Sequence, residues 1–134
     1  MADTFELELA TPERLLMREQ VSEAQIPGSN GYLGILPGHA PLLSELMPGY
    51  MSYTSGGRKF FLAIRGGFVE VLPDKVRVLA DAAERAEEID VQRAEAALKR
   101  AQERLTEPHV EIDVARALSA MHRAEARLEA ARHR

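Results

Sequence analysis

Six arginines in the last third of the sequence fall into two rows with the same i, i+7, i+11 spacing. The rows are Arg93, Arg100 and Arg104, followed by Arg116, Arg123 and Arg127. On a helix this spacing puts each row on one face. Such guanidinium groups could bind a phosphate bidentately, or they could form a solvated helix flank paired with nearby glutamates. Periodicity alone leaves both interpretations open and favours the solvated flank.

The two arginine rows lie in an internal repeat. The segments EIDVQRAEAALKRAQERL (Glu88–Leu105) and EIDVARALSAMHRAEARL (Glu111–Leu128) are identical at 11 of 18 positions. Their Ala, Glu, Arg and Leu content predicts helix, and Pro108 between them predicts a break. We therefore expect an antiparallel helical hairpin, with Asp90 and Asp113 capping the N-terminus of each helix.

The predicted hairpin has a thin apolar seam with 4-3-4 spacing. Its members are Ala94, Leu98, Ala101 and Leu105, and then Ala117, Met121, Ala124 and Leu128. Alanine lets two helices approach closely but removes little apolar surface from water. The hairpin should therefore be marginal by itself and should need a docking surface or a ligand. Modest energies could switch such an element between arrangements.

The preceding part of the chain has a different composition. All nine glycines and all aromatic residues precede residue 84, as does every proline except Pro108. Turn signals separate about eight short runs typical of strands, beginning with the alternation of Phe5, Leu7 and Leu9. We predict an α+β chain: an N-terminal antiparallel β-sandwich over residues 1–84, followed by a C-terminal antiparallel α-helical hairpin over residues 85–134.

Composition excludes several classes of function. The 134-residue chain has no cysteine and a net charge of −4, which argues against thiol chemistry and nucleic-acid binding. It lacks a phosphate-cradling glycine motif, an apolar run that could insert into a membrane and a signal peptide. Its histidines show no metal-ligand spacing. We expect a soluble cytosolic protein that is not an enzyme.

Two segments carry a resemblance that covers essentially the whole chain. The segments GYLGILPGHAPLL (residues 31–43) and RGGFVEVLPDKVRVLADAAERAEEID (residues 65–90) resemble the ε subunit of bacterial F-type ATP synthases. The resemblance implies a noncatalytic subunit of the rotary central stalk, whose sandwich binds the γ subunit and the c-ring. It implies a hairpin that inhibits ATP hydrolysis when it extends into the catalytic α/β head. It also implies a peripheral location on the cytoplasmic face of the bacterial cell membrane.

The segment Ile89–Ala94 matches the I(L)DxxRA motif of the ATP-binding variant of this family. The resemblance implies a regulatory ATP site, with or without Mg²⁺, in which arginines hold the phosphates and other residues border the nucleoside. The implied site residues are Glu84, Ile89, Asp90, Arg93, Ala94, Arg100, Arg123 and Arg127. The second copy, Ile112–Ala117, also fits the motif, and we favour the first because the family's site lies there.

The resemblance also implies partner contacts on the sandwich. The residues expected to face the c-ring and γ are Gly28, Ser29, Asn30, Gly31 and His39, although Pro-Gly and Asn-Gly pairs are also ordinary turn chemistry. A rival interpretation is a structural or adaptor subunit of the rotor whose hairpin does not sense ATP. Another is a free-standing nucleotide-binding regulator.

Overall fold

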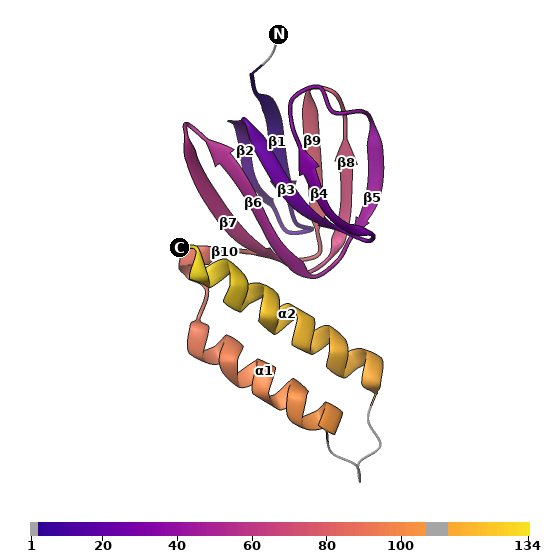
Figure 1. Cartoon of the computed structure of the whole chain (residues 1–134), viewed down its shortest axis with the longest axis vertical. Helices are drawn as coiled ribbons and strands as arrows, with labels where there is room; N and C mark the ends of the chain where they lie inside the picture. Colours follow the sequence, from indigo (N-terminus) through magenta and orange to yellow (C-terminus); the bar gives the residue numbers. More distant parts are fainter. Residues whose placement is uncertain (1–2, 107–112) are drawn as a thin grey trace.

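The computed structural model describes residues 3–106 and 113–134. Within these residues the chain forms ten strands, one turn of 3₁₀ helix and two α-helices, in that order (Figure 1). The strands make a sandwich-like body at one end. The two helices lie side by side at the other end, with α2 against the strands and α1 on its far side. The predicted α+β class, with a β-sandwich followed by a helical hairpin, is confirmed.

The strands form one continuous hydrogen-bonded path that curls on itself. They are β1 (Phe5–Ala10), β2 (Leu15–Val21), β3 (Glu23–Gly28), β4 (Gly31–Ile35), β5 (Leu42–Leu46), β6 (Gly49–Ser55), β7 (Arg58–Ile64), β8 (Gly67–Val71), β9 (Lys75–Ala80) and β10 (Ala83–Arg85). Their order is β10-β7-β6-β3-β5-β8-β9-β1-β2, with β4 added to β3. The described pairings are antiparallel except β1 with β9. Because the sheet curls, Ser22, which links β2 to β3, lies next to β6. Its N–H donates to Thr54 O (2.8 Å).

Alternating side chains build the sandwich core. Phe5, Leu7 and Leu9 are buried, while the glutamates between them are half-buried. The same period of two buries Val76, Val78 and Ala80 in β9. Other fully buried members include Val21, Ile26, Ile35, Met51, Tyr53, Leu62, Ile64, Val69 and Val71. This core is independent of the helices, so the sandwich can serve as their support.

Two strands depart from the sequence-based prediction. Val21 ends β2, and Ile26 lies in the next strand, β3. Strand β2 lacks clean alternation, since its Leu15 is 47% exposed and a bulge shifts its register beside Ala10. The short β10 was not predicted, because it lies in a charged segment. It pairs with Leu62, Ala63 and Ile64 of β7. The predicted domain boundary after residue 84 lies inside this strand.

Gly67 is required by the packing of β8 on β9. Its φ is +120°, and a Cβ at this position would collide with the carbonyl oxygen of Leu79. Gly66, at φ +145°, precedes it. The pair lets the chain leave β7 and enter β8 in a conformation that other residues rarely adopt.

The helical part comprises η1 (Ala86–Glu88), α1 (Val91–Thr106) and α2 (Val114–Arg132). Both predicted N-caps are confirmed: Asp90 Oδ1 accepts from Arg93 N–H (3.1 Å), and Asp113 Oδ1 accepts from Arg116 N–H (3.1 Å). Pro108 and the rest of residues 107–112 lie outside the described residues. No helix of the described ranges is long and apolar enough to cross a bilayer.

The helix seam is the predicted one. Its four alanines, Ala94, Ala101, Ala117 and Ala124, are buried, while its Leu and Met members are half-buried. On another face, α2 buries Ala130 and Ala131 in a cluster with Ala63 of β7 and Ile89. Helix α2 thus packs between α1 and strands β6 and β7 (Figure 1).

The end of the helical part is fastened to the sandwich and to the linker. The His133 ring stacks on Phe61 with centroids 4.1 Å apart. Arg134 Nη1 donates to Ile89 O (3.0 Å), in the segment that precedes α1. The hairpin therefore has the docking surface that its thin seam predicts.

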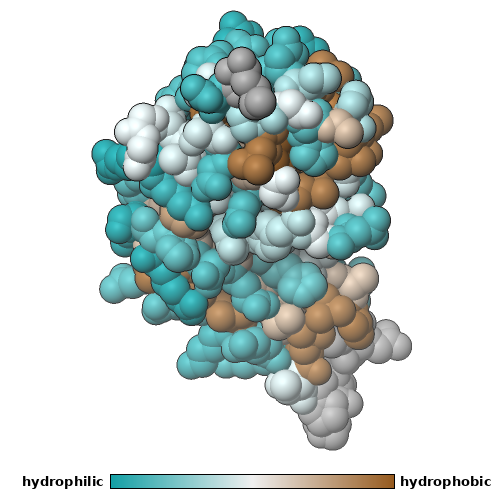
Figure 2. All heavy atoms as spheres, turned by 45° about the horizontal axis from the view of Figure 1, so that its top comes forward, coloured by the Kyte–Doolittle hydropathy of each residue, from teal (hydrophilic) through white to brown (hydrophobic). Residues whose placement is uncertain are grey.

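An apolar row crosses the outer surface of the sandwich. Cross-strand register places Phe68 beside Leu79, Leu79 beside Ala10, and Ala10 beside Leu15. Phe68 and Leu79 are 56% and 53% exposed. Figure 2 shows hydrophobic surface on the sandwich, part of it at the right of the view, the side of β5 and β8 in Figure 1. Contiguous exposed apolar surface of this kind is typical of interaction sites.

Candidate functional site

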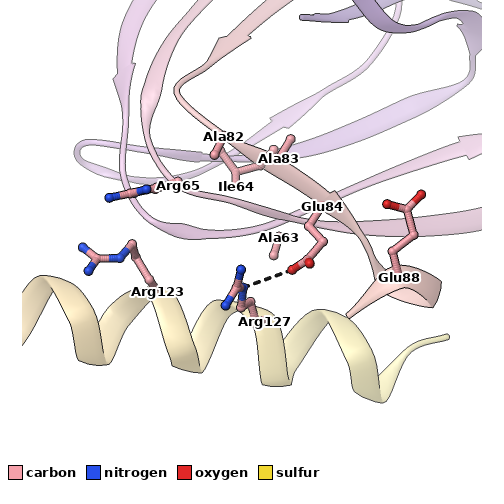
Figure 3. Close-up of a pocket in the computed structure, with 9 residues that line it drawn as sticks. All are labelled: Ala63, Ile64, Arg65, Ala82, Ala83, Glu84, Glu88, Arg123 and Arg127. Atoms are coloured by element: carbon pink, nitrogen blue, oxygen red, sulfur yellow. Dashed lines mark ion pairs between the residues drawn. The ribbon is translucent and has the colours of Figure 1, made fainter. Parts of the chain in front are cut away.

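A cavity of about 430 Å³ lies between the sandwich and α2. Its walls come from the end of β7, the start of β10, η1 and one face of α2 (Figure 3). The lining residues are Ala63, Ile64, Arg65, Ala82, Ala83, Glu84, Glu88, Arg123 and Arg127. Three guanidinium groups therefore meet two carboxylates in one hollow.

A second cavity, of about 270 Å³, lies between α1 and α2. The described residues that line it are all arginine or alanine: Arg93, Ala97, Arg100, Ala101, Arg104, Ala117, Ala120, Arg123, Ala124 and Arg127. Small side chains at the seam leave a hollow, and long cationic ones surround it. Arg123 and Arg127 line both cavities, so the two cavities adjoin along α2.

Positive charge predominates among the residues that line the two cavities. Burial lowers the pKa of the Arg123 guanidinium, and the nearby charges of Arg65, Arg127 and Arg116 lower it further. Like charges that face one another favour a bound anion, because the anion relieves their repulsion. Forked guanidinium donors suit phosphate oxygens in particular.

Glu84 partly balances the arginines. Its Oε1 lies 3.0 Å from Arg127 Nε, and the two side chains are 31% and 41% exposed. The geometry of this contact is not that of a hydrogen bond, so the buried Oε1 has an ionic partner but accepts no hydrogen bond from the described residues. A ligand that offers a hydroxyl or amino group would satisfy this oxygen.

Eight site residues are implied by the resemblance, and five of them line the cavities in the structure. These are Glu84, Arg93, Arg100, Arg123 and Arg127. Ile89 is instead buried against Ala63 and α2, and Ala94 is buried in the seam. Asp90 is exposed and caps α1 through one carboxylate oxygen. These three residues lie at the start of α1 but do not line the cavities.

Sequence reasoning missed Arg65 and Glu88. Arg65 directly follows β7, and its backbone N–H donates to Ala82 O (2.9 Å), which fixes the residue at the cavity edge. Nothing in its local spacing links it to the helices, since only the tertiary fold brings β7 to α2. Arg104 belongs to a row noted from periodicity and lines the second cavity, whereas Arg116 contributes charge without lining either one.

The partner residues implied on the sandwich are not brought together. Ser29 and Asn30 form the turn between β3 and β4, held by the bond from Ser29 N–H to Glu45 O (3.0 Å). His39 follows the far end of β4, next to Gly38, whose N–H donates to Pro73 O (3.0 Å) at the turn between β8 and β9. The length of β4 therefore separates the two segments. Among residues 3–106 and 113–134, no group of three His, Asp or Glu side chains could hold a metal ion.

Comparison with known proteins covers both parts of the chain. Residues 4–86 match the beta-sandwich domain of the ATP synthase delta/epsilon chain, and residues 87–132 match its long alpha-helix domain. The ATP synthase epsilon chain of Solibacter usitatus is 62% identical over 108 residues, which is 81% of each chain. That of Koribacter versatilis is 61% identical over 105 residues, covering 78% of this chain and 74% of the relative.

A solved structure agrees along the full length. A chain in the cryo-electron microscopy structure of the Euglena gracilis mitochondrial ATP synthase superposes with a TM-score of 0.85 at 29% identity. The match covers 99% of this chain and 84% of the other. The chain therefore belongs to the ATP synthase delta/epsilon family, as an epsilon chain of the F-type central stalk, which is a structural and regulatory subunit rather than a catalytic one.

Proposed function

We propose that the hairpin of this subunit is a conformational inhibitor of ATP hydrolysis that bound ATP holds in the docked arrangement. The observation that carries the proposal is the arginine-lined double cavity, whose walls come from α1, α2 and the sandwich together. The site is complete only while the hairpin is docked. A ligand of this site therefore favours docking over extension toward the α/β head.

The chemistry of the walls suggests how ATP would lie. Arg93, Arg100, Arg123 and Arg127 hold the phosphates, and Glu84 accepts a hydrogen bond from the nucleoside. Of the three motif residues at the start of α1, the exposed Asp90 is the one that could border the nucleoside, because Ile89 and Ala94 are buried in packing contacts. If Mg²⁺ accompanies ATP, the phosphates would supply its ligands. Glu84 and Glu88, which both line the first cavity, are the carboxylates that could add to them.

The size of the effect follows from linkage. A ligand that binds only the docked form stabilises it by RT ln(1 + [L]/Kd), or about 1.4 kcal/mol at ten times Kd. An Ala-rich seam packs weakly enough for such an energy to change the populations. An affinity near the cellular ATP concentration would make the hairpin an ATP sensor.

Amide chemical shifts of the full chain, followed during an ATP titration with and without Mg²⁺, test the sensor. Saturable shifts around Arg93, Arg100 and Arg123 are expected. The variant Arg100→Ala should weaken binding, whereas Arg132→Ala, outside the cavities, should not. If the amide chemical shifts did not change at millimolar ATP, the hairpin would not be an ATP sensor.

Inhibition needs a separate test in the assembled enzyme. A subunit truncated after Glu88 keeps the sandwich and loses the hairpin, so the enzyme should hydrolyse ATP faster. Unchanged hydrolysis, with the truncated subunit still present in the complex, would rule out an inhibitory hairpin.

The sandwich is proposed to join the hairpin to the rotor. We assign the exposed row of Phe68, Leu79 and Leu15 to the γ subunit, and the Gly28–Gly31 turn and His39 to contacts with the c-ring and γ. We further propose that the subunit lies on the cytoplasmic face of the bacterial membrane and takes part there in proton-driven ATP synthesis. Capture by γ should fail for Phe68→Ser with Leu79→Ser and persist for Arg58→Ala.

The second candidate is a rotor adaptor whose hairpin does not sense ATP. The stacking of His133 on Phe61 and the bond from Arg134 to Ile89 O favour it, because these contacts dock the hairpin without a ligand. Retention by γ together with an absent ATP response would select this candidate.

A further inference from the structure

Arg65 and Arg123 face each other across the boundary between the sandwich and the hairpin. Arg65 follows the last residue of β7, and Arg123 stands on α2; both line the first cavity. Figure 3 shows both guanidinium groups at the same end of the cavity, away from the pair of Glu84 and Arg127. One cation thus comes from each side of the interface.

Neither of these two arginines is neutralised within the described ranges. No carboxylate oxygen of residues 3–106 or 113–134 lies within 4.0 Å of a guanidinium nitrogen of Arg65 or Arg123, whereas Arg127 has Glu84 at 3.0 Å. The charge of Arg65 contributes to the lowered pKa of Arg123. Docking of α2 therefore brings the half-buried Arg123 toward the exposed Arg65, so that two like charges repel each other.

We propose that Arg65 is the sandwich half of an anion clamp, in which Arg65 and Arg123 oppose docking of the hairpin until a phosphate group lies between them. The ligand's identity as a nucleotide phosphate rests on the proposed function. The repulsion itself rests only on the positions of the two side chains.

The clamp gives Arg65 two opposite effects on the hairpin. Without an anion, its charge weakens docking. With a phosphate between the guanidinium groups, the same charge adds an attractive contact that ties α2 to the sandwich. Arg65 thereby increases the difference between the docked fraction of the hairpin with ligand and that without ligand. A sensor requires such a difference.

The variant Arg65→Ala tests both effects in the full chain. Spin labels on Gln25→Cys and Gln102→Cys report docking as a distance between β3 and α1, and the chain has no native cysteine. Arg58→Ala is the matched control, because it removes the same charge from the opposite end of β7. Arg65→Lys keeps the charge but not the planar fork.

The clamp predicts opposite changes in the two measurements. For Arg65→Ala, the docked-to-extended ratio without ligand should rise about two- to fivefold. Its Kd for ATP and for inorganic tripolyphosphate should rise about tenfold. Arg58→Ala should match the wild type, and Arg65→Lys should dock like the wild type and recover part of the affinity.

The outcomes separate this proposal from the ATP sensor. An unchanged Kd in Arg65→Ala, or weaker docking without ligand, overturns the clamp. Binding of tripolyphosphate but not of ATP by the wild type, with loss in Arg65→Ala, supports the clamp and contradicts the sensor. A wild type that binds neither probe overturns both.

Discussion

Arg127 of α2 places its Nε 3.0 Å from Oε1 of Glu84 in β10, and this ion pair joins the hairpin to the sandwich. The pair stands on the wall of the cavity that Arg65 and Arg123 line. One cation of α2 is therefore held to the sandwich, while another faces a like charge. The balance between these two contacts sets how firmly the hairpin is docked without a ligand.

Replacing Glu84 should shift that balance. In Glu84→Gln, Arg127 loses its ionic partner, so the docked-to-extended ratio without ligand should fall about two- to fivefold, the range for a partly exposed pair. Hydrogen exchange of the Ala130 and Ala131 amides measures the change. The control is Glu88→Gln, since Glu88 lines the same cavity and no ion pair within 4.0 Å is described for it. Equal exchange in both variants would show that the pair does not hold α2.

A comparison of variants at the two N-cap aspartates distinguishes a role in helix capping from a role in ligand binding. Asp90 and Asp113 make the same 3.1 Å capping bond, so Asp90→Ala and Asp113→Ala should each destabilise their helix by about 1 kcal/mol. Only Asp90→Ala should also weaken ATP binding if the first motif copy forms the site. Thermal unfolding and ATP titration of both variants give the comparison. An equal loss of ATP affinity in both would assign Asp90 to capping alone.

The hairpin was predictable from sequence because its information is local. The repeat predicted two helices, and the caps and the alanine seam follow from spacing within each helix. The same periodicity placed Arg93, Arg100 and Arg104 on one face, which lines the second cavity. Local spacing could not show whether that face meets solvent or another helix.

What the sequence could not predict depends on long-range contacts. Arg65 and Arg123 are far apart in the chain and meet only because β7 supports α2. Ile89 and Ala94 match a binding motif, yet in this arrangement they fill packing positions. Strand β10 could not be predicted, because three residues in a charged segment are too few to show a strand-like alternation. Its conformation is decided by its pairing with β7.

The sandwich has its own pH response through Glu8. Burial alone would raise the pKa of this carboxyl, but the Lys75 ammonium and the Arg18 and Arg77 guanidinium groups hold it below its ordinary value of 4.5. The charged carboxylate therefore stabilises the folded chain above about pH 4.5, and this contribution is lost as the pH falls below that value. Urea unfolding should show Glu8→Gln less stable than the wild type at pH 7. The difference should shrink as the pH falls toward 3, and a constant difference would contradict this role.

The alanine seam should control both helix packing and the anion site. Ala101 is 3% exposed between the helices and lines the second cavity. In Ala101→Leu the larger side chain should push α1 from α2, at a cost of about 1–3 kcal/mol. The separation also carries Arg100 and Arg104 away from Arg123, so ATP affinity should fall together with helix stability.

Ala96→Leu is the matched control, because Ala96 lies on the exposed face of α1 and leucine is nearly as good a helix former as alanine. Circular dichroism reports the helices, and ATP titration reports the site. The sandwich core shares no residue with the seam, so its unfolding should be unchanged in both variants. If Ala101→Leu bound ATP as tightly as Ala96→Leu, the site would not depend on close approach of the two helices.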